Sequence, residues 1–201
     1  MLEFARLERA EFAEMAAGLS PSQWDMPSLC AGWSVRDVVA HTIAYLGQSR
    51  TRLTINMYRA RGDLDRLNAV ELHRFAAADP AKLVRLLQAG IEPAGAGALY
   101  GGRVALIECM VHQQDVRRAV GLPRCIPLDR VRASLNYARI SPVIRGARLV
   151  HGVRLSATDM DWTIGNGPEV RGSGEALLLT MTGRGPSVRN ELTGDGVPLI
   201  T

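Results

Sequence analysis

Apolar residues recur at helical spacing through most of the chain, which predicts a mainly α-helical protein. The expected helices cover residues 2–18, 35–61, 63–90 with a break at Asp79-Pro80, 103–121 and 128–140. Helices of these lengths suit a four-helix bundle. After residue 143 the pattern changes to short alternating stretches separated by glycine turns. We therefore expect a helical bundle over residues 1–143 and a small α+β domain over residues 144–201 that packs on it.

The start of the helix at residue 35 carries a strong local signal. Ser34 and Asp37 predict a capping box, with the Ser34 side chain as the N-cap and the Asp37 carboxylate reaching back to it. The preceding loop, residues 22–33, contains large apolar side chains that include Trp33. Such a loop either closes over a pocket, which makes Trp33 a substrate-binding candidate, or packs Trp33 as a hydrophobic staple. The sequence leaves both interpretations open.

The helix over residues 103–121 has ionisable groups within its apolar face. At about 100° per residue, Glu108, His112 and Asp115 fall within about 60° of one another. A buried carboxylate without a partner costs several kcal/mol, so a positive group must meet it. A divalent metal ion held by Glu108 and His112, four residues apart on one face, would satisfy the carboxylate. An arginine from another helix, next to a Glu–His pair, would satisfy it as well.

A second histidine lies at the edge of the core on the helix over residues 35–61. Asp37, His41, Tyr45 and Gln48 share one face of that helix. Taken alone, a histidine in this position is more often a hydrogen-bonded packing residue than a metal ligand. Asp37, one turn before His41, is a candidate hydrogen-bond acceptor for its imidazole, and the alternative is an exposed helical acid.

Composition and charge exclude several classes of function. No apolar run approaches the roughly 18–20 residues that span a bilayer, and the N-terminus lacks the order of a signal peptide. We therefore expect a cytoplasmic protein with no membrane partner. The net charge is +4, but the arginines are scattered among acidic residues, which argues against nucleic-acid binding. Cys30, Cys109 and Cys125 lack CxxC spacing and are expected as free, buried thiols, with Cys109 nearest to Glu108.

Two motifs together carry a resemblance to a known family. The first motif is Leu29–His41 (LCAGWSVRDVVAH), and the second is Glu108–Gly121 (ECMVHQQDVRRAVG). With these motifs the chain resembles the DinB-like superfamily and, within it, the mycothiol-dependent maleylpyruvate isomerase family. The C-terminal part is also similar to that family, notably over Gly152–Asp159 (GVRLSATD).

The resemblance implies a DinB-like four-helix bundle that holds one divalent metal ion through His41, Glu108 and His112. Zinc is the ion expected first, with nickel or iron as alternatives. The resemblance also implies mycothiol, a low-molecular-weight thiol, as the cosubstrate whose sulfur takes the open metal position and attacks a small electrophile. Asp115 is then a candidate acceptor behind a ligand imidazole.

The reaction stays open at this stage. An isomerase would release the thiol after rotation about a double bond, and a transferase would keep the new C–S bond. Arg184, after a short apolar helix, is a candidate to bind a substrate carboxylate, with Trp33 and Tyr45 as further substrate-binding candidates. The alternatives are a metal- or thiol-binding stress protein without turnover and a bundle without metal. Monomer and homodimer both fit the sequence.

Overall fold

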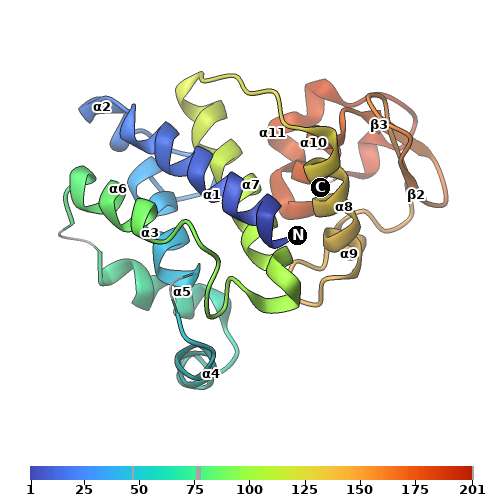
Figure 1. Cartoon of the computed structure of the whole chain (residues 1–201). Coiled ribbons are helices and arrows are strands. Elements are labelled where there is room, and N and C mark those ends of the chain that lie inside the picture. Colours follow the sequence, from blue (N-terminus) through green and yellow to red (C-terminus); the bar gives the residue numbers. More distant parts are fainter. Residues whose placement is uncertain (47, 76–77, 201) are drawn as a thin grey trace. The chain divides into compact units, whose positions relative to one another are not determined.

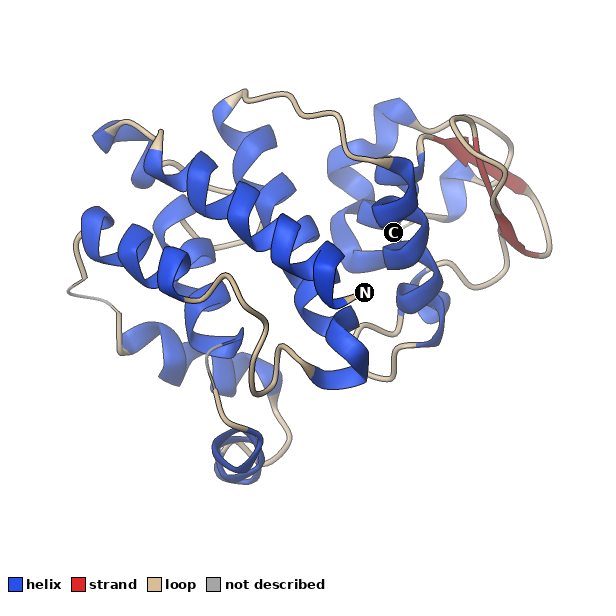
Figure 2. Cartoon of the chain, viewed as in Figure 1, coloured by secondary structure: helices blue, strands red, loops and turns tan. Residues whose placement is uncertain are grey.

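The structure is a computed structural model that describes residues 1–46, 48–75 and 78–200. Its contacts divide the chain into two units, Met1–Pro123 and Arg124–Thr201. The named elements of the first unit are helices, and the three-stranded sheet belongs to the second unit (Figure 2). In the described part of the chain, no helix combines the length and the apolar character needed to cross a membrane.

The first unit is built around four helices that share one core. Its elements are α1 (Leu2–Ala17), α2 (Pro21–Trp24), α3 (Val35–Leu46), α4 (Arg50–Arg59), α5 (Leu64–His73), α6 (Pro80–Ala89), the 3-10 helix η1 (Leu99–Gly102) and α7 (Arg103–Val120), and Figure 1 labels the α-helices among them. Helix α1 packs against α6 and α7, and α3 packs against the same two helices. The largest fully buried side chains of this unit are Phe12, Leu83, Leu106, Ile107 and Met110. The predicted four-helix bundle is therefore confirmed, with α1, α3, α6 and α7 as its members.

Helix α7 has the bounds that the sequence predicted. It ends at Gly121, which has a φ of 73° and adopts the left-handed conformation that a Cβ would disfavour. The amide of Leu122 donates to the Arg117 carbonyl at 2.8 Å, which closes the end of the helix. A long stretch of α7 is buried, so its polar side chains depend on partners inside the unit.

The single helix predicted over residues 35–61 is wrong, because the structure has two helices, α3 and α4. The Ser49 side chain accepts a hydrogen bond from the Arg52 amide at 3.2 Å and is the N-cap of α4. The Gln48 carbonyl accepts from the Ala96 amide at 2.9 Å instead of from a helical amide. The apolar spacing through this region predicted one helix, whereas the Ser49 side chain caps the first turn of a second helix.

The break predicted at Asp79-Pro80 is confirmed. Asp79 is the N-cap of α6, and its carboxylate accepts from the Lys82 amide at 2.6 Å. Pro80 occupies the first helical position, where its missing N–H costs no helical hydrogen bond.

The second unit combines short helices with a small sheet. Its elements are α8 (Leu128–Ile140), α9 (Gly146–Leu149), β1 (Arg154–Ala157), β2 (Thr163–Gly165), β3 (Glu169–Gly172), α10 (Gly174–Leu179), η2 (Thr180–Arg184), α11 (Gly185–Val188), η3 (Arg189–Glu191) and η4 (Val197–Leu199). The strand order is β2-β1-β3, with β1 antiparallel to β2 and parallel to β3. Its largest fully buried side chains are Leu135, Leu155, Leu177, Leu178, Leu179 and Met181. The small α+β C-terminal part predicted from the sequence is present.

The contact division and the predicted domain boundary differ over α8. Residues 128–140 belong to the predicted bundle domain, which ends at residue 143, whereas the contacts divide the chain after Pro123. Helix α8 packs against α9 and α10 of the second unit. Its Asn136 side chain also accepts a hydrogen bond from the Trp162 indole at 3.0 Å.

Candidate metal centre

Two packed helices bring three predicted ligands together. His41 lies on α3, Glu108 and His112 lie on α7, and these helices pack against each other. The Nε2 atom of His41 lies 3.7 Å from Glu108 Oε2, and the Nε2 atom of His112 lies 3.2 Å from the same oxygen. The two imidazole centroids are 4.9 Å apart with the rings nearly perpendicular. Both histidines are buried, whereas the Glu108 side chain keeps 22% exposure.

These separations fit a metal ion. Metal–nitrogen and metal–oxygen bonds of about 2.0–2.1 Å place the ligand atoms of a tetrahedral site about 3.4 Å apart. The distances from Glu108 Oε2 to the Nε2 atoms of His112 and His41, 3.2 Å and 3.7 Å, lie on either side of this value. One possible donor atom from each of the three residues falls within 4.8 Å of the others. Two imidazoles and one carboxylate are a donor set for zinc and related divalent ions, and they leave a position for an exogenous ligand.

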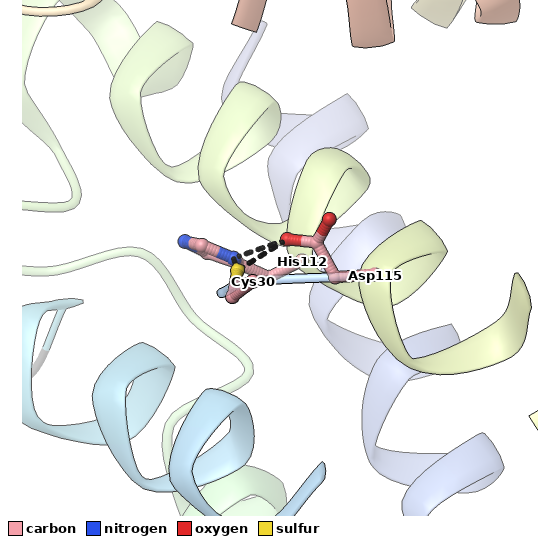
Figure 3. Close-up of side chains that lie close together, drawn as sticks. All are labelled: Cys30, His112 and Asp115. Atoms are coloured by element: carbon pink, nitrogen blue, oxygen red, sulfur yellow. Dashed lines mark hydrogen bonds and ion pairs between the residues drawn. The ribbon is translucent and has the colours of Figure 1, made fainter. Parts of the chain in front are cut away.

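A second group of side chains lies behind His112. Figure 3 shows Cys30, His112 and Asp115 close together, with Asp115 Oδ2 2.9 Å from His112 Nδ1 and 3.0 Å from Cys30 Sγ. The donor atoms of this group also lie within 4.8 Å of one another. Ligands of one tetrahedral ion, with a longer metal–sulfur bond of about 2.3 Å, would lie about 3.4–3.6 Å apart. The shorter distances are those of hydrogen bonds, so His112 faces Glu108 with Nε2 and Asp115 with Nδ1.

The electrostatics of the three side chains favour an ionised Glu108 carboxylate. Burial raises the pKa of Glu108, but hydrogen bonds from His112 and His41 lower it more, so the net pKa is well below its ordinary value. Burial lowers the pKa of His112, but hydrogen bonds to Asp115, Cys30 and Glu108 raise it well above 6.5. The positive group that the sequence required beside Glu108 is thus supplied by histidine.

The loop before α3 contacts residues of the candidate metal centre. The ring centroids of Trp33 and His41 are 5.0 Å apart, and the two ring planes form an angle of 56°. The amide of Leu29 donates to the backbone carbonyl of Asp115 at 3.2 Å. Trp33 therefore contacts a predicted ligand, and the loop is attached to α7 through Asp115.

The predicted capping box is confirmed. The Ser34 amide and hydroxyl donate to Asp37 Oδ2 at 2.9 Å and 2.7 Å, and the Asp37 amide donates to the Ser34 hydroxyl at 3.2 Å. The Asp37 carboxylate thus stabilises the start of the helix that carries His41.

The position of Cys30 was not predicted from the sequence. All three cysteines were expected to be buried, with Cys109 nearest to Glu108. Cys109 is indeed buried, and burial raises the pKa of its thiol to about 12, but Cys125 is exposed and Cys30 is half-buried beside Asp115. The available signal was the place of Cys30 in the same loop motif as Trp33.

Two predicted substrate-binding residues, Tyr45 and Arg184, are not among the described side chains that the structure brings together at this site. Tyr45 belongs to α3, but its side chain lies outside the described residues. Arg184 belongs to the second unit, where it is half-buried and its Nη1 donates to the Thr182 carbonyl at 2.6 Å. The structure therefore groups His41, Glu108 and His112 with Asp115 and Trp33.

Comparisons with known proteins agree with the family resemblance. Residues 5–92 match the family model of the mycothiol maleylpyruvate isomerase N-terminal domain. The fold is similar to a crystal structure of the mycothiol-dependent maleylpyruvate isomerase, with a TM-score of 0.61 and 15% identity over 96% of this chain and 91% of that chain. It is also similar to a histidine-to-alanine mutant of that enzyme, with a TM-score of 0.60 and 14% identity over the same shares. No curated protein matches the chain in sequence.

These comparisons confirm the resemblance for the first motif, Leu29–His41, which lies within the matched residues, and they show that the fold is shared. The family match spans Cys30, Trp33 and His41 and ends before Glu108 and His112. The completion of the site by α7 is therefore an observation of this structure.

Proposed function

We propose that this chain, whose residues 5–92 match the mycothiol maleylpyruvate isomerase N-terminal domain, is a metal-dependent enzyme that activates mycothiol for attack on a small electrophile. One observation supports the proposal above all others. Two imidazoles and a carboxylate, from helices distant in sequence, converge with separations that suit one divalent ion.

The chain's own residues hold the ion in this proposal. His41 and His112 would bind through Nε2, and Glu108 would bind through its carboxylate, which its lowered pKa keeps ionised. Zinc is the first candidate, with nickel or iron as alternatives. When bound, the ion lowers the pKa of a thiol in its open position, which supplies a nucleophilic sulfur at neutral pH. Asp115 accepts a hydrogen bond from His112 Nδ1 and keeps the lone pair of Nε2 directed at the ion.

The match to the mycothiol maleylpyruvate isomerase N-terminal domain favours an isomerase reaction over a transferase reaction. The thiol sulfur would add to an activated double bond, rotation would follow, and the C–S bond would break again to release the thiol. A transferase would instead retain the C–S bond and release a thioether. We propose Arg184 as a group that binds a carboxylate of the electrophile, and Trp33 and Tyr45 as further substrate contacts.

Metal analysis combined with thiol-binding calorimetry tests the proposal. The wild-type protein should retain about one divalent ion per chain after dialysis and should bind mycothiol only when loaded with metal. Glu108→Gln should retain little metal and should bind the thiol weakly. His73→Ala is the matched control, because His73 is exposed at the end of α5 and its loss should change neither property. A wild-type protein that binds no transition metal contradicts the proposal.

A turnover assay distinguishes an enzyme from a protein that only binds metal or thiol. With metal and mycothiol present, maleylpyruvate or a related unsaturated acid should give a cis–trans isomer or a thioether, detected by mass spectrometry. Uptake of metal and thiol without either product would favour a metal- or thiol-binding protein without turnover.

A further inference from the structure

The side chain of Asp115 is completely buried. Its residue has 0% exposure, so its carboxylate must be met by hydrogen-bond donors. Two of its contacts come from different parts of the chain: His112 Nδ1 at 2.9 Å from within α7 and Cys30 Sγ at 3.0 Å from the loop before α3 (Figure 3). The same carboxylate oxygen, Oδ2, makes both contacts. The thiol of Cys30 and the ring of His112 are therefore coupled through one atom.

We infer that Cys30 is a positioning residue of the metal centre, whose thiol holds the Asp115 carboxylate so that Asp115 fixes the ring orientation and tautomer of His112. This inference rests on the proposed metal site. An Nδ1–H donated to Asp115 leaves the Nε2 lone pair of His112 for the ion. Because Cys30 and His112 share Oδ2, loss of the thiol would allow the carboxylate to rotate and would release the imidazole from its present direction.

The distances favour a thiol donor over a second metal ligand. A thiolate at 3.0 Å from a carboxylate oxygen would repel it, whereas an S–H group donates to it. The Cys30 sulfur lies 3.9 Å from Nδ1 of His112, on the opposite side of the ring from the Nε2 atom that faces Glu108. Cys30 therefore acts on the site through Asp115 and His112.

The loop that carries Cys30 is itself held in place. The Cys30 amide donates to the Ser28 hydroxyl at 3.1 Å, and that hydroxyl donates to the Trp33 carbonyl at 2.9 Å. The Leu29 amide donates to the Asp115 carbonyl, so backbone and side chain attach the loop to the same residue of α7. One short loop thus orients both proposed histidine ligands, with Cys30 acting on His112 through Asp115 and Trp33 contacting the ring of His41.

Cobalt binding to purified full-length variants tests the inference without an activity assay. Cys30→Ala should bind Co²⁺ about 10–100-fold more weakly than wild type, as other losses of an outer hydrogen-bond partner do. Its visible absorption spectrum should also change, because the direction of one imidazole ligand changes. Cys30→Ser should recover part of the affinity and of the wild-type spectrum, because its hydroxyl also donates but reaches less far. Cys125→Ala removes an exposed thiol of the second unit and should match wild type.

Each contrary result has a distinct meaning. If wild type binds Co²⁺ and Cys30→Ala binds it equally tightly with an unchanged spectrum, the positioning role is overturned while the proposed metal site stands. A strong sulfur-to-cobalt charge-transfer band in wild type that both Cys30 variants lack would make Cys30 a ligand and would also overturn the inference. If wild type binds no metal, the proposed site and the inference fail together. Should Cys30→Ala not fold, as judged by circular dichroism, the comparison of Cys30→Ser with wild type decides.

Discussion

The rings of His41 and His112 lie 4.9 Å apart and nearly perpendicular, although one belongs to α3 and the other to α7. Helix α7 supplies two of the three proposed ligands, Glu108 and His112. The third proposed ligand, His41, comes from α3. The site therefore depends on the packing of these two helices, and changes that loosen either one should also weaken metal binding.

Loss of His41 should remove metal without unfolding the bundle. In His41→Ala we expect the affinity for Zn²⁺ to fall by more than about tenfold, because only two of the three proposed ligands remain. Metal content after dialysis and a competition titration with a chelator measure the effect, and far-UV circular dichroism checks the fold. His151→Ala, at an exposed histidine in a turn of the second unit, should leave the affinity unchanged. Equal metal content in His41→Ala and His151→Ala would show that His41 is not a metal ligand.

Metal affinity should rise with pH and then level off. In the metal-free protein, the pKa of His112 is raised above 6.5, so below that pKa an incoming ion must displace a proton from the imidazole. The apparent affinity for Zn²⁺ should increase by about tenfold per pH unit until His112 is deprotonated and should be constant above that point. Calorimetry in buffers of different ionisation enthalpy measures both the affinity and the proton released.

Asp115→Asn provides the matched comparison for this pH dependence. The variant removes a hydrogen bond that raises the pKa of His112, so its affinity should level off at a lower pH than in wild type. An affinity that is independent of pH in the wild-type protein would contradict the prediction.

Removing the cap of α3 should reduce stability and metal binding together. Ser34→Ala loses the hydroxyl that accepts from the Asp37 amide and should cost about 1 kcal/mol in the free energy of unfolding. Because α3 carries His41, a frayed helix start should also weaken Zn²⁺ binding. Ser20→Ala is the control, since Ser20 caps the four-residue helix α2, which carries none of the proposed ligands. Chemical denaturation and metal titration of both variants measure the two effects, and a Ser34→Ala protein with wild-type metal affinity would be the contrary result.

The core of the first unit should be intolerant of cavities. Phe12 on α1 has 0% exposure, and Phe12→Ala should lower the free energy of unfolding by about 3–5 kcal/mol. Tyr58→Ala removes an aromatic side chain of similar size that is 85% exposed, and its effect should stay within about 0.5 kcal/mol. Urea denaturation followed by circular dichroism compares them, and similar losses in the two variants would show that α1 is not part of the folded core.

The helical pattern of the sequence was sufficient to predict the bundle and much of its local detail. The bounds of α7, the Asp79-Pro80 start of α6 and the Ser34–Asp37 cap all depend on side-chain and backbone chemistry within a few residues. The same reasoning failed between α3 and α4. The apolar pattern favoured one helix over residues 35–61, whereas the structure begins a new helix after Ser49.

The partners of each candidate site residue were decided by the tertiary structure. From the sequence, Glu108 and His112 were known to share a helical face, but a metal ion and an arginine were equally good partners for them. Only the packing of α3 on α7 brings His41 to the same carboxylate oxygen, and only the path of the loop before α3 brings Cys30 to Asp115. The physical reason is that helical periodicity determines which residues share a face, whereas the residue that meets that face depends on contacts between segments far apart in the chain.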